Sequence, residues 1–316
     1  MSELSVRRVI AVTNPHSGVG RGGGVAATVL TKLLQSGVEV VRVEAESAAA
    51  SVREVSEALA DPRRRPDVVV CIGGDGLMNV LLAAMAHSGV PLGLVPAGTG
   101  NDFARELGIP TNDPVAATEI VLRGRTRVLD LGHIESESAT PSWFATVVGT
   151  GFDAQVTMRA NEMRYPRGPL RYTAAAALAL LGSYTLPFRI ELSGLAPGAL
   201  DNPAEAHAVL ALDAVMAPVG NTRTYGGGML VCPEATPDDG YLDVTVVGAV
   251  SRVAMARLLP ALSAGKRIDH PATKRYRARR ITISAAGGYA TADGEAAGTL
   301  PITLQAMPGA LTVVVP

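Results

Sequence analysis

The sequence predicts a two-domain α/β protein, in which a parallel-sheet domain precedes a β-rich domain. The first third of the chain alternates short runs of β-branched residues with amphipathic stretches, and this β-α-β rhythm is typical of a parallel sheet with right-handed crossovers. After about residue 125, strand-like runs follow one another with few helices between them, as in a sandwich of antiparallel sheets. The fold class is therefore α/β, with a parallel sheet in the N-terminal domain and a β-sandwich in the C-terminal domain.

The N-terminal elements follow from apolar spacing and from residues that cap helices. Strands are expected at residues 8–13, 38–43, 68–72 and 91–95, and helices at about 25–35, from Ser47 onwards and at about 77–88. Ser47 is an expected N-cap, because its hydroxyl can accept a hydrogen bond from the first turn. The strand at 68–72 is a continuous apolar run, which predicts burial on both faces of the sheet.

The C-terminal elements are mostly strands. We expect them at residues 128–134, 143–149, 188–192, 208–217, 241–247, 279–284 and 311–315, with helices at about 170–183 and 251–262. No flexible linker separates the two parts, so we expect the domains to pack together with a cleft between them. The expected domains are residues 1–128 and 129–316, and a return of the last strand to the first domain stays open.

The amino-acid composition narrows the classes of protein to which this chain can belong. Of the 316 residues 47% are hydrophobic and 18% are charged, and the formal net charge of -1 argues against a general nucleic-acid binder. Cys71 and Cys232 fit reduced core residues of a cytosolic protein. No secretory signal opens the chain, and the apolar run at 174–181 is far shorter than the roughly 20 residues that span a bilayer. We expect a cytoplasmic protein, and peripheral association with a membrane stays open.

Glycine-rich turns follow three of the predicted strands, at residues 14–22, 73–76 and 98–102. Glycines at the carboxyl end of a parallel strand let the backbone approach a phosphate, and N–H groups at a helix start can bind its oxygens. Asp75, in the second turn, can hold Mg²⁺ or polarise a hydroxyl. An ordinary strand–helix turn is the alternative for the first segment, and helix capping by Asn101 or Asp102 for the third. The chain is expected to handle phosphate.

Taken in order along the chain, these motifs resemble the diacylglycerol kinase catalytic-domain superfamily, which includes bacterial diacylglycerol-kinase-like lipid kinases, sphingosine kinases and ceramide kinases. The matching segments are Asn14-Pro15-His16-Ser17-Gly18, Gly73-Gly74-Asp75-Gly76, 98–103, 149–154, 225–229 and Asp293-Gly294-Glu295. The resemblance covers nearly the whole chain. It implies a nucleotide-binding α/β domain like that of NAD kinases, a β-rich lipid-binding domain, and ATP and Mg²⁺ as cofactors.

The resemblance also implies roles for individual residues, carried over by position. Asp75 and Asp102 would lie near Mg²⁺ and the transferring phosphoryl group, and Asp293 or Glu295 would take the proton from a lipid hydroxyl. The expected ATP-binding residues are Asn14, Ser17, Gly18, Gly73, Gly74, Asp75, Gly76, Asn79, Thr99, Gly100 and Asn101. Such roles suit phosphoryl transfer, which needs positioning, charge neutralisation and an acceptor for one proton.

A structural Mg²⁺, found in some bacterial members, would fall on Thr236, Asp239 and Tyr241. Asp239 would give its carboxylate and the other two their carbonyls, and hard oxygen ligands of this kind suit Mg²⁺. The alternative is a metal-free hairpin turn at residues 238–240.

Two positions depart from the superfamily pattern. Leu77 and Val80 stand where the family usually has Thr and Glu. The first change removes a hydroxyl that could contact a phosphate, and the second removes a hydrogen-bond or metal partner. Either change could lower nucleotide affinity or alter how the nucleotide is held.

Two basic segments each have two interpretations. One comprises Lys274, Arg275, Arg277, Arg279 and Arg280 on a predicted strand, and the other comprises Arg159, Arg164, Arg167 and Arg171. Both can be solvated faces, or they can attract anionic lipid. The apolar helix at residues 170–181 is expected in the core, with an acyl-chain pocket as the alternative.

These observations and the resemblance predict an ATP-dependent lipid kinase that phosphorylates a lipid hydroxyl, with diacylglycerol as the expected acceptor and phosphatidic acid as the product. The alternatives are a sphingoid-base or ceramide kinase, a soluble NAD-kinase-like enzyme, and a catalytically weak nucleotide- or lipid-binding regulator. The expected partner is a membrane lipid, with peripheral contact to an anionic membrane surface and no nucleic acid. The oligomeric state stays open, a homodimer included.

Overall fold

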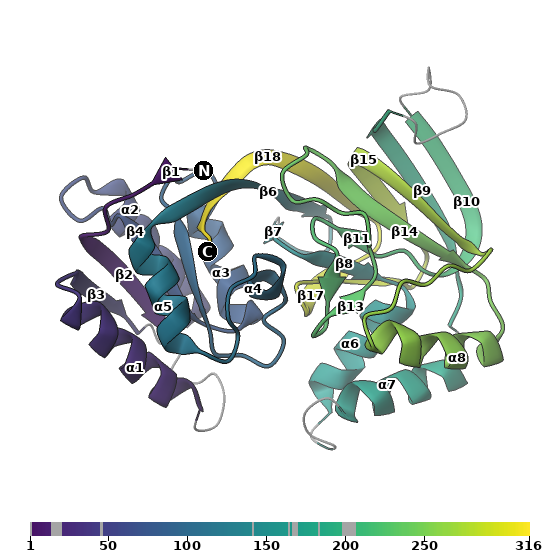
Figure 1. Ribbon diagram of the computed structural model, residues 1–316. Helices are drawn as coiled ribbons and strands as arrows, with labels where there is room; N and C mark the ends of the chain where they lie inside the picture. Colours follow the sequence, from purple (N-terminus) through teal and green to yellow (C-terminus); the bar gives the residue numbers. More distant parts are fainter. Residues whose placement is uncertain are drawn as a thin grey trace. The chain divides into compact units, whose positions relative to one another are not determined.

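The protein chain divides into two compact units in a computed structural model (Figure 1). The structure describes residues 2–13, 21–44, 47–140, 142–163, 165, 170–182, 184–197 and 207–316. Unit 1 comprises residues 1–131 and 308–316, and unit 2 comprises residues 132–307. Unit 1 is therefore assembled from two separate stretches of sequence.

Unit 1 is built on a parallel sheet with the strand order β5-β4-β2-β3. Its strands are β2 (Arg8–Thr13), β3 (Glu39–Val43), β4 (Val68–Gly73) and β5 (Leu92–Pro96). Every residue of β4 is buried, as its continuous apolar sequence predicted. Two further strands join this unit: β1 (Ser2–Glu3) pairs with the start of β6 (Arg125–Ser136), and Val313 of β18 (Ile302–Val314) pairs in parallel with Leu92.

The helices of unit 1 cover both faces of this sheet. Helix α1 (Arg21–Gln35) packs beside α5 (Pro114–Arg123), and α2 (Ala48–Ala60) packs beside α3 (Asp75–Met85) on the opposite face (Figure 1). The predicted N-cap is confirmed, because the Ser47 hydroxyl accepts a hydrogen bond from the Ala50 N–H at 3.2 Å. The sequence analysis missed α5, although Asp113 caps its first turn. The helix that Asn101 was expected to cap is the short α4 (Asp102–Glu106), and Asn101 is its N-cap residue without a side-chain capping bond.

Unit 2 is an antiparallel β structure, as predicted. Its strands, besides β6 and β18, are β7 (Ser142–Phe144), β8 (Val147–Thr150), β9 (Leu186–Leu195), β10 (His207–Met216), β11 (Val219–Gly220), β12 (Thr224–Tyr225), β13 (Met229–Leu230), β14 (Leu242–Gly248), β15 (Thr273–Ser284), β16 (Tyr289–Ala292) and β17 (Glu295–Thr299). Strands β9, β10, β14 and β15 pair in a closed cycle. The short strands β11, β8, β16 and β17 continue from β14 in that order.

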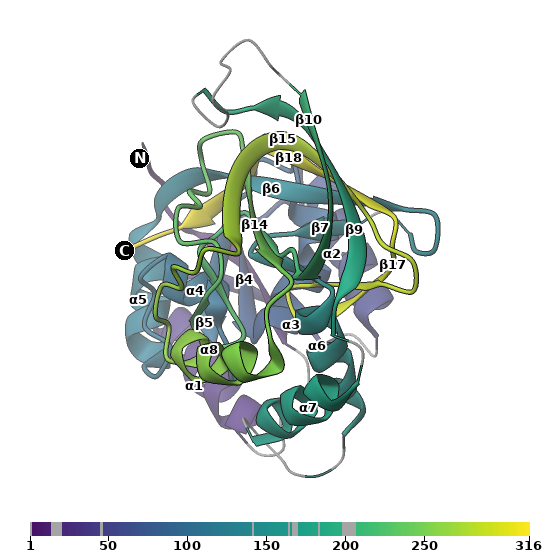
Figure 2. The ribbon, with the colours of Figure 1, turned by 90° about the vertical axis from the view of Figure 1, so that its right-hand side faces the viewer.

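Three helices lie on one side of this sheet: α6 (Phe152–Glu162), α7 (Leu170–Leu181) and α8 (Arg252–Ser263) (Figures 1 and 2). A hydrophobic cluster joins them to the strands, with Met216 and Val247 from the sheet and Ala179 and Met255 from the helices. The expectation that residues 170–181 form core is only half right. Ala175 and Ala179 are buried, but the opposite face of α7 is exposed.

Candidate active site

The turn between β4 and α3 places the start of a helix at the carboxyl end of the parallel strands, where open α/β sheets bind ligands. Gly74 is the N-cap residue of α3, and no side chain caps the helix there. Asp75 and Gly76 form the first turn and are half-exposed. The first N–H groups of a helix have no intrahelical acceptor, and with the helix dipole they favour an anion. This turn can bind phosphate oxygens.

The loop after β5 is locked against that turn. The Asn101 side chain accepts a hydrogen bond from the Gly98 N–H at 3.1 Å and donates one to the Gly98 carbonyl at 2.9 Å. The Asn101 N–H in turn donates to Asp75 Oδ2 at 2.6 Å. A Cβ added to Gly98 would lie 2.6 Å from the Gly74 Cα, so the two backbones touch only because both residues are glycine. Two of the predicted phosphate loops therefore form one cradle.

Two carboxylates flank Gly100 in this cradle. Oδ2 of Asp75 lies 2.6 Å, and Oδ2 of Asp102 3.3 Å, from the position that a Gly100 Cβ would occupy. Asp102 is buried, and Arg105 Nε donates to the Gly100 carbonyl at 2.9 Å. Paired carboxylate oxygens are ligands that Mg²⁺ prefers, so these residues fit the implied ion.

The remaining predicted ATP-binding residues are spread around this cradle. Asn79 lies on α3, one helical turn after Asp75, and Thr99 is exposed in the β5–α4 loop. Asn14, Ser17 and Gly18 lie outside the described residues. Leu77 is buried, and its Cδ2 would lie 2.8 Å from a Gly73 Cβ, so this departure from the family pattern packs into the core of unit 1.

In unit 2, the turn between β16 and β17 holds two of the predicted catalytic residues in different environments. Asp293 is buried with a positive φ of 50°, and its carboxylate accepts hydrogen bonds from Ala145 and Thr146. Ala145 N donates to Oδ2 at 3.0 Å, while Thr146 N and Thr146 Oγ1 donate to Oδ1 at 2.8 and 2.5 Å. Glu295, two residues on, is exposed. Asp293 is thus engaged in fixing the turn, and Glu295 presents its carboxylate to solvent.

The sequence analysis missed the residues that hold this turn. Besides Thr146, Asn221 is buried, donates from its side chain to the Ala145 carbonyl at 3.0 Å and from its backbone to the Thr146 carbonyl at 2.8 Å. Neither residue belongs to a glycine motif, so the sequence carried no signal for them. Their role appears only once β8 and β16 pair.

Two motifs that are far apart in sequence meet at Asp153, on the first turn of α6. Tyr225 Oη donates to Asp153 Oδ2 at 3.3 Å, and Ala154 N donates to Oδ1 at 2.9 Å. Burial raises the pKa of Asp153 to about 7, and these hydrogen bonds only partly oppose that rise. A Cβ on Gly149 would lie 2.7 Å from this carboxylate, which explains the glycine there.

The proposed structural metal ligands lie in a tight turn. Asp239 Oδ1 accepts a hydrogen bond from Tyr241 N at 3.0 Å, and Arg277 forms an ion pair with Asp239 Oδ2. Thr236 is exposed on the same loop. The described parts of the chain hold no group of three His, Cys, Asp or Glu residues that could bind a metal. At Asp239, the Arg277 guanidinium already pairs with Oδ2, so a Mg²⁺ held by this carboxylate would have to share or displace that ion pair.

The basic strand β15 is not a free cationic face. Arg275 contacts Asp269, and Arg277 contacts Asp239 and, at 3.4 Å, Asp243. Burial raises the pKa of the Asp243 carboxyl to about 7, in spite of Arg277. Arg280 pairs with Glu135 at 3.1 Å. Most of the strand's positive charge is therefore compensated by acids of unit 2.

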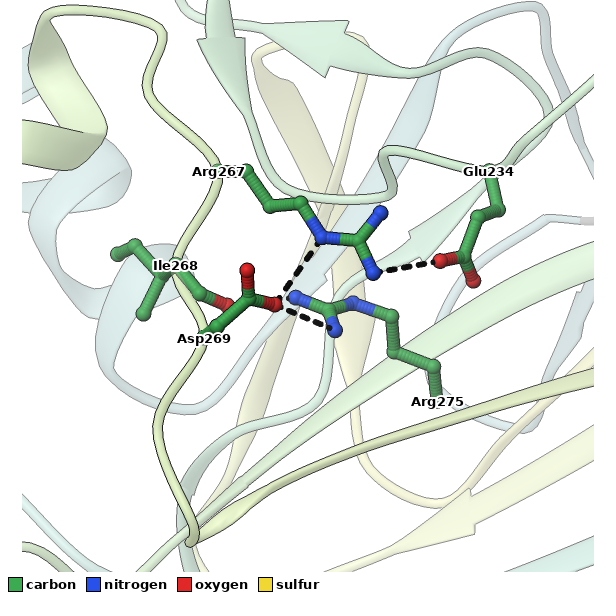
Figure 3. Close-up of polar contacts among 5 residues, drawn as sticks. All are labelled: Glu234, Arg267, Ile268, Asp269 and Arg275. Atoms are coloured by element: carbon green, nitrogen blue, oxygen red, sulfur yellow. Dashed lines mark hydrogen bonds and ion pairs between the residues drawn. The ribbon is translucent and has the colours of Figure 1, made fainter.

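An apolar pocket lies beneath one end of that strand. It is lined by Met216, Leu230, Val231, Thr245, Val247, Met255, Leu258, Leu259, Leu262, Ile268, Thr273 and Arg275. An ion-pair network borders it, in which Arg267 joins Glu234 at 2.9 Å and Asp269 at 3.0 Å (Figure 3). Arg275 also donates to the Ile268 carbonyl at 2.6 Å (Figure 3). Its lining is mostly apolar, and the cavity is small, at about 30 Å³.

A parallel α/β unit with a glycine-lined phosphate cradle, joined to an antiparallel β unit, defines a two-unit kinase of the NAD-kinase type. Family models match both parts: the diacylglycerol kinase catalytic domain at residues 8–134, and the YegS C-terminal NAD kinase beta sandwich-like domain at residues 146–315. The chain therefore belongs to the diacylglycerol kinase and YegS-like lipid kinase family.

Individual relatives agree with this assignment. A protein of Mycobacterium tuberculosis named diacylglycerol kinase is 38% identical over 98% of this chain and 96% of its own. A Xanthomonas oryzae protein named "Probable lipid kinase YegS-like" is 36% identical over 74% of this chain and 72% of its own. A solved diacylglycerol kinase structure from Bacillus anthracis has a TM-score of 0.72 at 22% identity, over 99% of this chain and 98% of that one, which shows the shared fold. Among the described residues, no helix combines the length and apolarity needed to cross a membrane.

Proposed function

We propose that this protein is an ATP-dependent kinase that transfers the γ-phosphate to the free hydroxyl of diacylglycerol and so forms phosphatidic acid. The observation that carries the proposal is the cradle in unit 1, where Asp75 and Asp102 flank Gly100 beside the start of α3. The acceptor is inferred from the M. tuberculosis relative, whose name specifies diacylglycerol and whose similarity extends over 98% of this chain.

The proposed role of unit 1 is to bind the phosphates of ATP and to neutralise their negative charge. The N–H groups of residues 74–76 and the glycine-lined loop at 98–100 would bind phosphate oxygens, and Asn79 and Thr99 would add side-chain contacts. Asp75 and Asp102 would hold Mg²⁺, which supplies charge neutralisation in phosphoryl transfer. The hydrogen bond from Asn101 N orients the Asp75 carboxylate for this role.

In unit 2, we infer that Glu295 accepts the proton of the lipid hydroxyl. A general base needs an accessible carboxylate, and Glu295 is exposed. Asp293, which the sequence left as an equal candidate, has three donors on its carboxylate and is buried. Its proposed role is to position the turn that carries Glu295.

The lipid end of the reaction is proposed for the apolar pocket behind α8. Met255, Leu259 and Leu262 line it, and Thr273 and Arg275 add polar groups. An acyl chain matches such a lining, and a nucleotide does not. Because diacylglycerol resides in membranes, the proposal includes peripheral contact with an anionic membrane surface from the cytoplasmic side.

The test is to incubate the purified protein with labelled ATP and Mg²⁺, offering diacylglycerol, sphingosine, ceramide or NAD as acceptor. We expect label to appear in the organic phase with diacylglycerol and to be lost in Asp75→Asn, which keeps the size of the side chain. If label appears only with sphingosine or ceramide, that lipid is the acceptor in place of diacylglycerol. If label appears in an aqueous product with NAD, the lipid-kinase proposal is wrong. ATP binding without any product would identify a regulator.

A further inference from the structure

Helix α7 is apolar on the face that it turns away from unit 2. Leu170, Leu178 and Leu181 are 66%, 47% and 78% exposed, and with Ala174 and Ala177 they recur at helical spacing along one stripe. A helix that is apolar on both faces needs a partner on the outer one. At twelve residues, α7 is too short to span a bilayer, so any membrane contact lies at the surface.

Helix α8 continues this surface with positive charge. Its N-terminus lies against the C-terminus of α7, because Arg252 Nη2 donates to the Gly182 carbonyl at 3.0 Å and its guanidinium covers the Tyr184 ring. Val253 is 61% exposed, and Arg257 is exposed one turn further along. We name the set Leu170, Leu178, Leu181, Arg252, Val253 and Arg257 the α7–α8 face.

The charges of this face are of one sign. Neither α7 nor α8 contains an Asp or Glu. Within the parts of the chain that the structure describes, Arg252 and Arg257 form no ion pair with a carboxylate, in contrast to Arg275 and Arg277 on β15. An anionic lipid surface complements this positive charge, whereas a second copy of the same face offers no carboxylate from α7 or α8 to pair with it.

We propose that the α7–α8 face docks unit 2 onto an anionic bilayer, with the leucines among the acyl chains and the arginines at the lipid phosphates. This inference rests on the proposed lipid kinase function and names the surface through which it operates. Helix α8 also separates this face from the apolar pocket, because its inner residues Met255, Leu259 and Leu262 line that pocket. Docking here therefore brings the proposed acyl site within one helix width of the bilayer.

The experiment compares the binding of the full chain to vesicles of phosphatidylcholine alone and of phosphatidylcholine with phosphatidylglycerol. We expect wild type to prefer the anionic vesicles and to lose that preference at high salt. Leu178→Gln/Leu181→Gln should weaken binding to both vesicle types by about tenfold or more. Arg257→Glu should weaken binding to the anionic vesicles alone by about thirtyfold, since each charge near the surface changes binding about fivefold.

Matched controls are available in unit 1. Leu34→Gln replaces a leucine on α1 that is 61% exposed, and Arg53→Glu reverses an exposed charge on α2. Both should bind vesicles as wild type does. Thermal unfolding of every variant should match wild type, because all the substituted side chains are exposed.

Two readouts separate this proposal from the function on which it rests. With a short-chain diacylglycerol in solution, the α7–α8 variants should turn over as fast as wild type and fail only with long-chain lipid in vesicles. If wild type phosphorylates no diacylglycerol, the kinase proposal fails while vesicle binding still tests the face. If Leu178→Gln/Leu181→Gln binds vesicles as wild type does, the α7–α8 face is not the membrane-docking surface. The proposal also fails if wild type is a dimer and this variant is a monomer that still binds vesicles, because the face would then be a dimer interface.

Discussion

Replacing Asp293 by Asn should lower the free energy of unfolding substantially, while the kcat of the molecules that stay folded should change little. If the Asn oxygen takes the place of Oδ1, it keeps the bonds from Thr146, and its amide group then faces the Ala145 N–H, a second donor. A buried N–H without an acceptor costs about 1–3 kcal/mol, and the two retained bonds weaken because the acceptor is no longer charged. The expected loss is about 2–4 kcal/mol, which would lower the melting temperature by roughly 10 °C.

Glu295→Gln is the matched variant, two residues away in the same turn. Its side chain is exposed, so the stability should change by less than about 0.5 kcal/mol. Loss of the proton acceptor should instead lower kcat by about 10²–10⁴-fold. The assay is urea unfolding of both variants, together with kcat on diacylglycerol corrected for the folded fraction. If Asp293→Asn keeps the wild-type unfolding midpoint and loses kcat as Glu295→Gln does, Asp293 reacts directly and the assignment is wrong.

Three further changes test other parts of the structure. Gly98→Ala should abolish ATP binding measured by calorimetry, because its Cβ would lie 2.6 Å from the Gly74 backbone; ATP binding equal to wild type would refute the cradle. Asp153→Asn should make stability depend less on pH: burial keeps the folded carboxyl protonated, so wild type loses stability as pH rises from about 4 to about 7. Urea midpoints across that range should fall less steeply in the variant than in wild type, and the buried Asp243 accounts for slope that remains. Arg277→Ala should let Mg²⁺ raise the melting temperature by binding at Asp239, whereas an equal Mg²⁺ effect on wild type would show that the ion displaces the arginine.

The parallel sheet was predictable because its signals are local. The run at 68–72 is buried on both faces, and the glycines and acids after β4 and β5 follow from what a phosphate site needs at strand ends. The resemblance also implied that Asp75 and Asp102, one in each loop, would lie near the same Mg²⁺. The contact between Asn101 N and Asp75 Oδ2 joins these two loops.

The different environments of Asp293, which is buried, and Glu295, which is exposed, were not predictable. They depend on Thr146 and Ala145, which reach Asp293 only through the pairing of β8 with β16, and no local pattern encodes that approach. The two interpretations of the basic strand stayed open for the same reason. The charges of Arg275 and Arg277 are visible in the sequence, but their partners Asp269 and Asp239 are chosen by the fold.

The way that residues 308–316 rejoin unit 1 also bears on how the protein is made. Their backbone supplies an acceptor to His87 N at 2.7 Å, a donor to the Arg125 carbonyl at 2.9 Å and a strand beside β5, so they complete that sheet. During synthesis, unit 1 therefore stays incomplete until all of unit 2 has emerged from the ribosome. A nascent chain that stops before residue 308 would therefore leave β5 without the strand that pairs beside it.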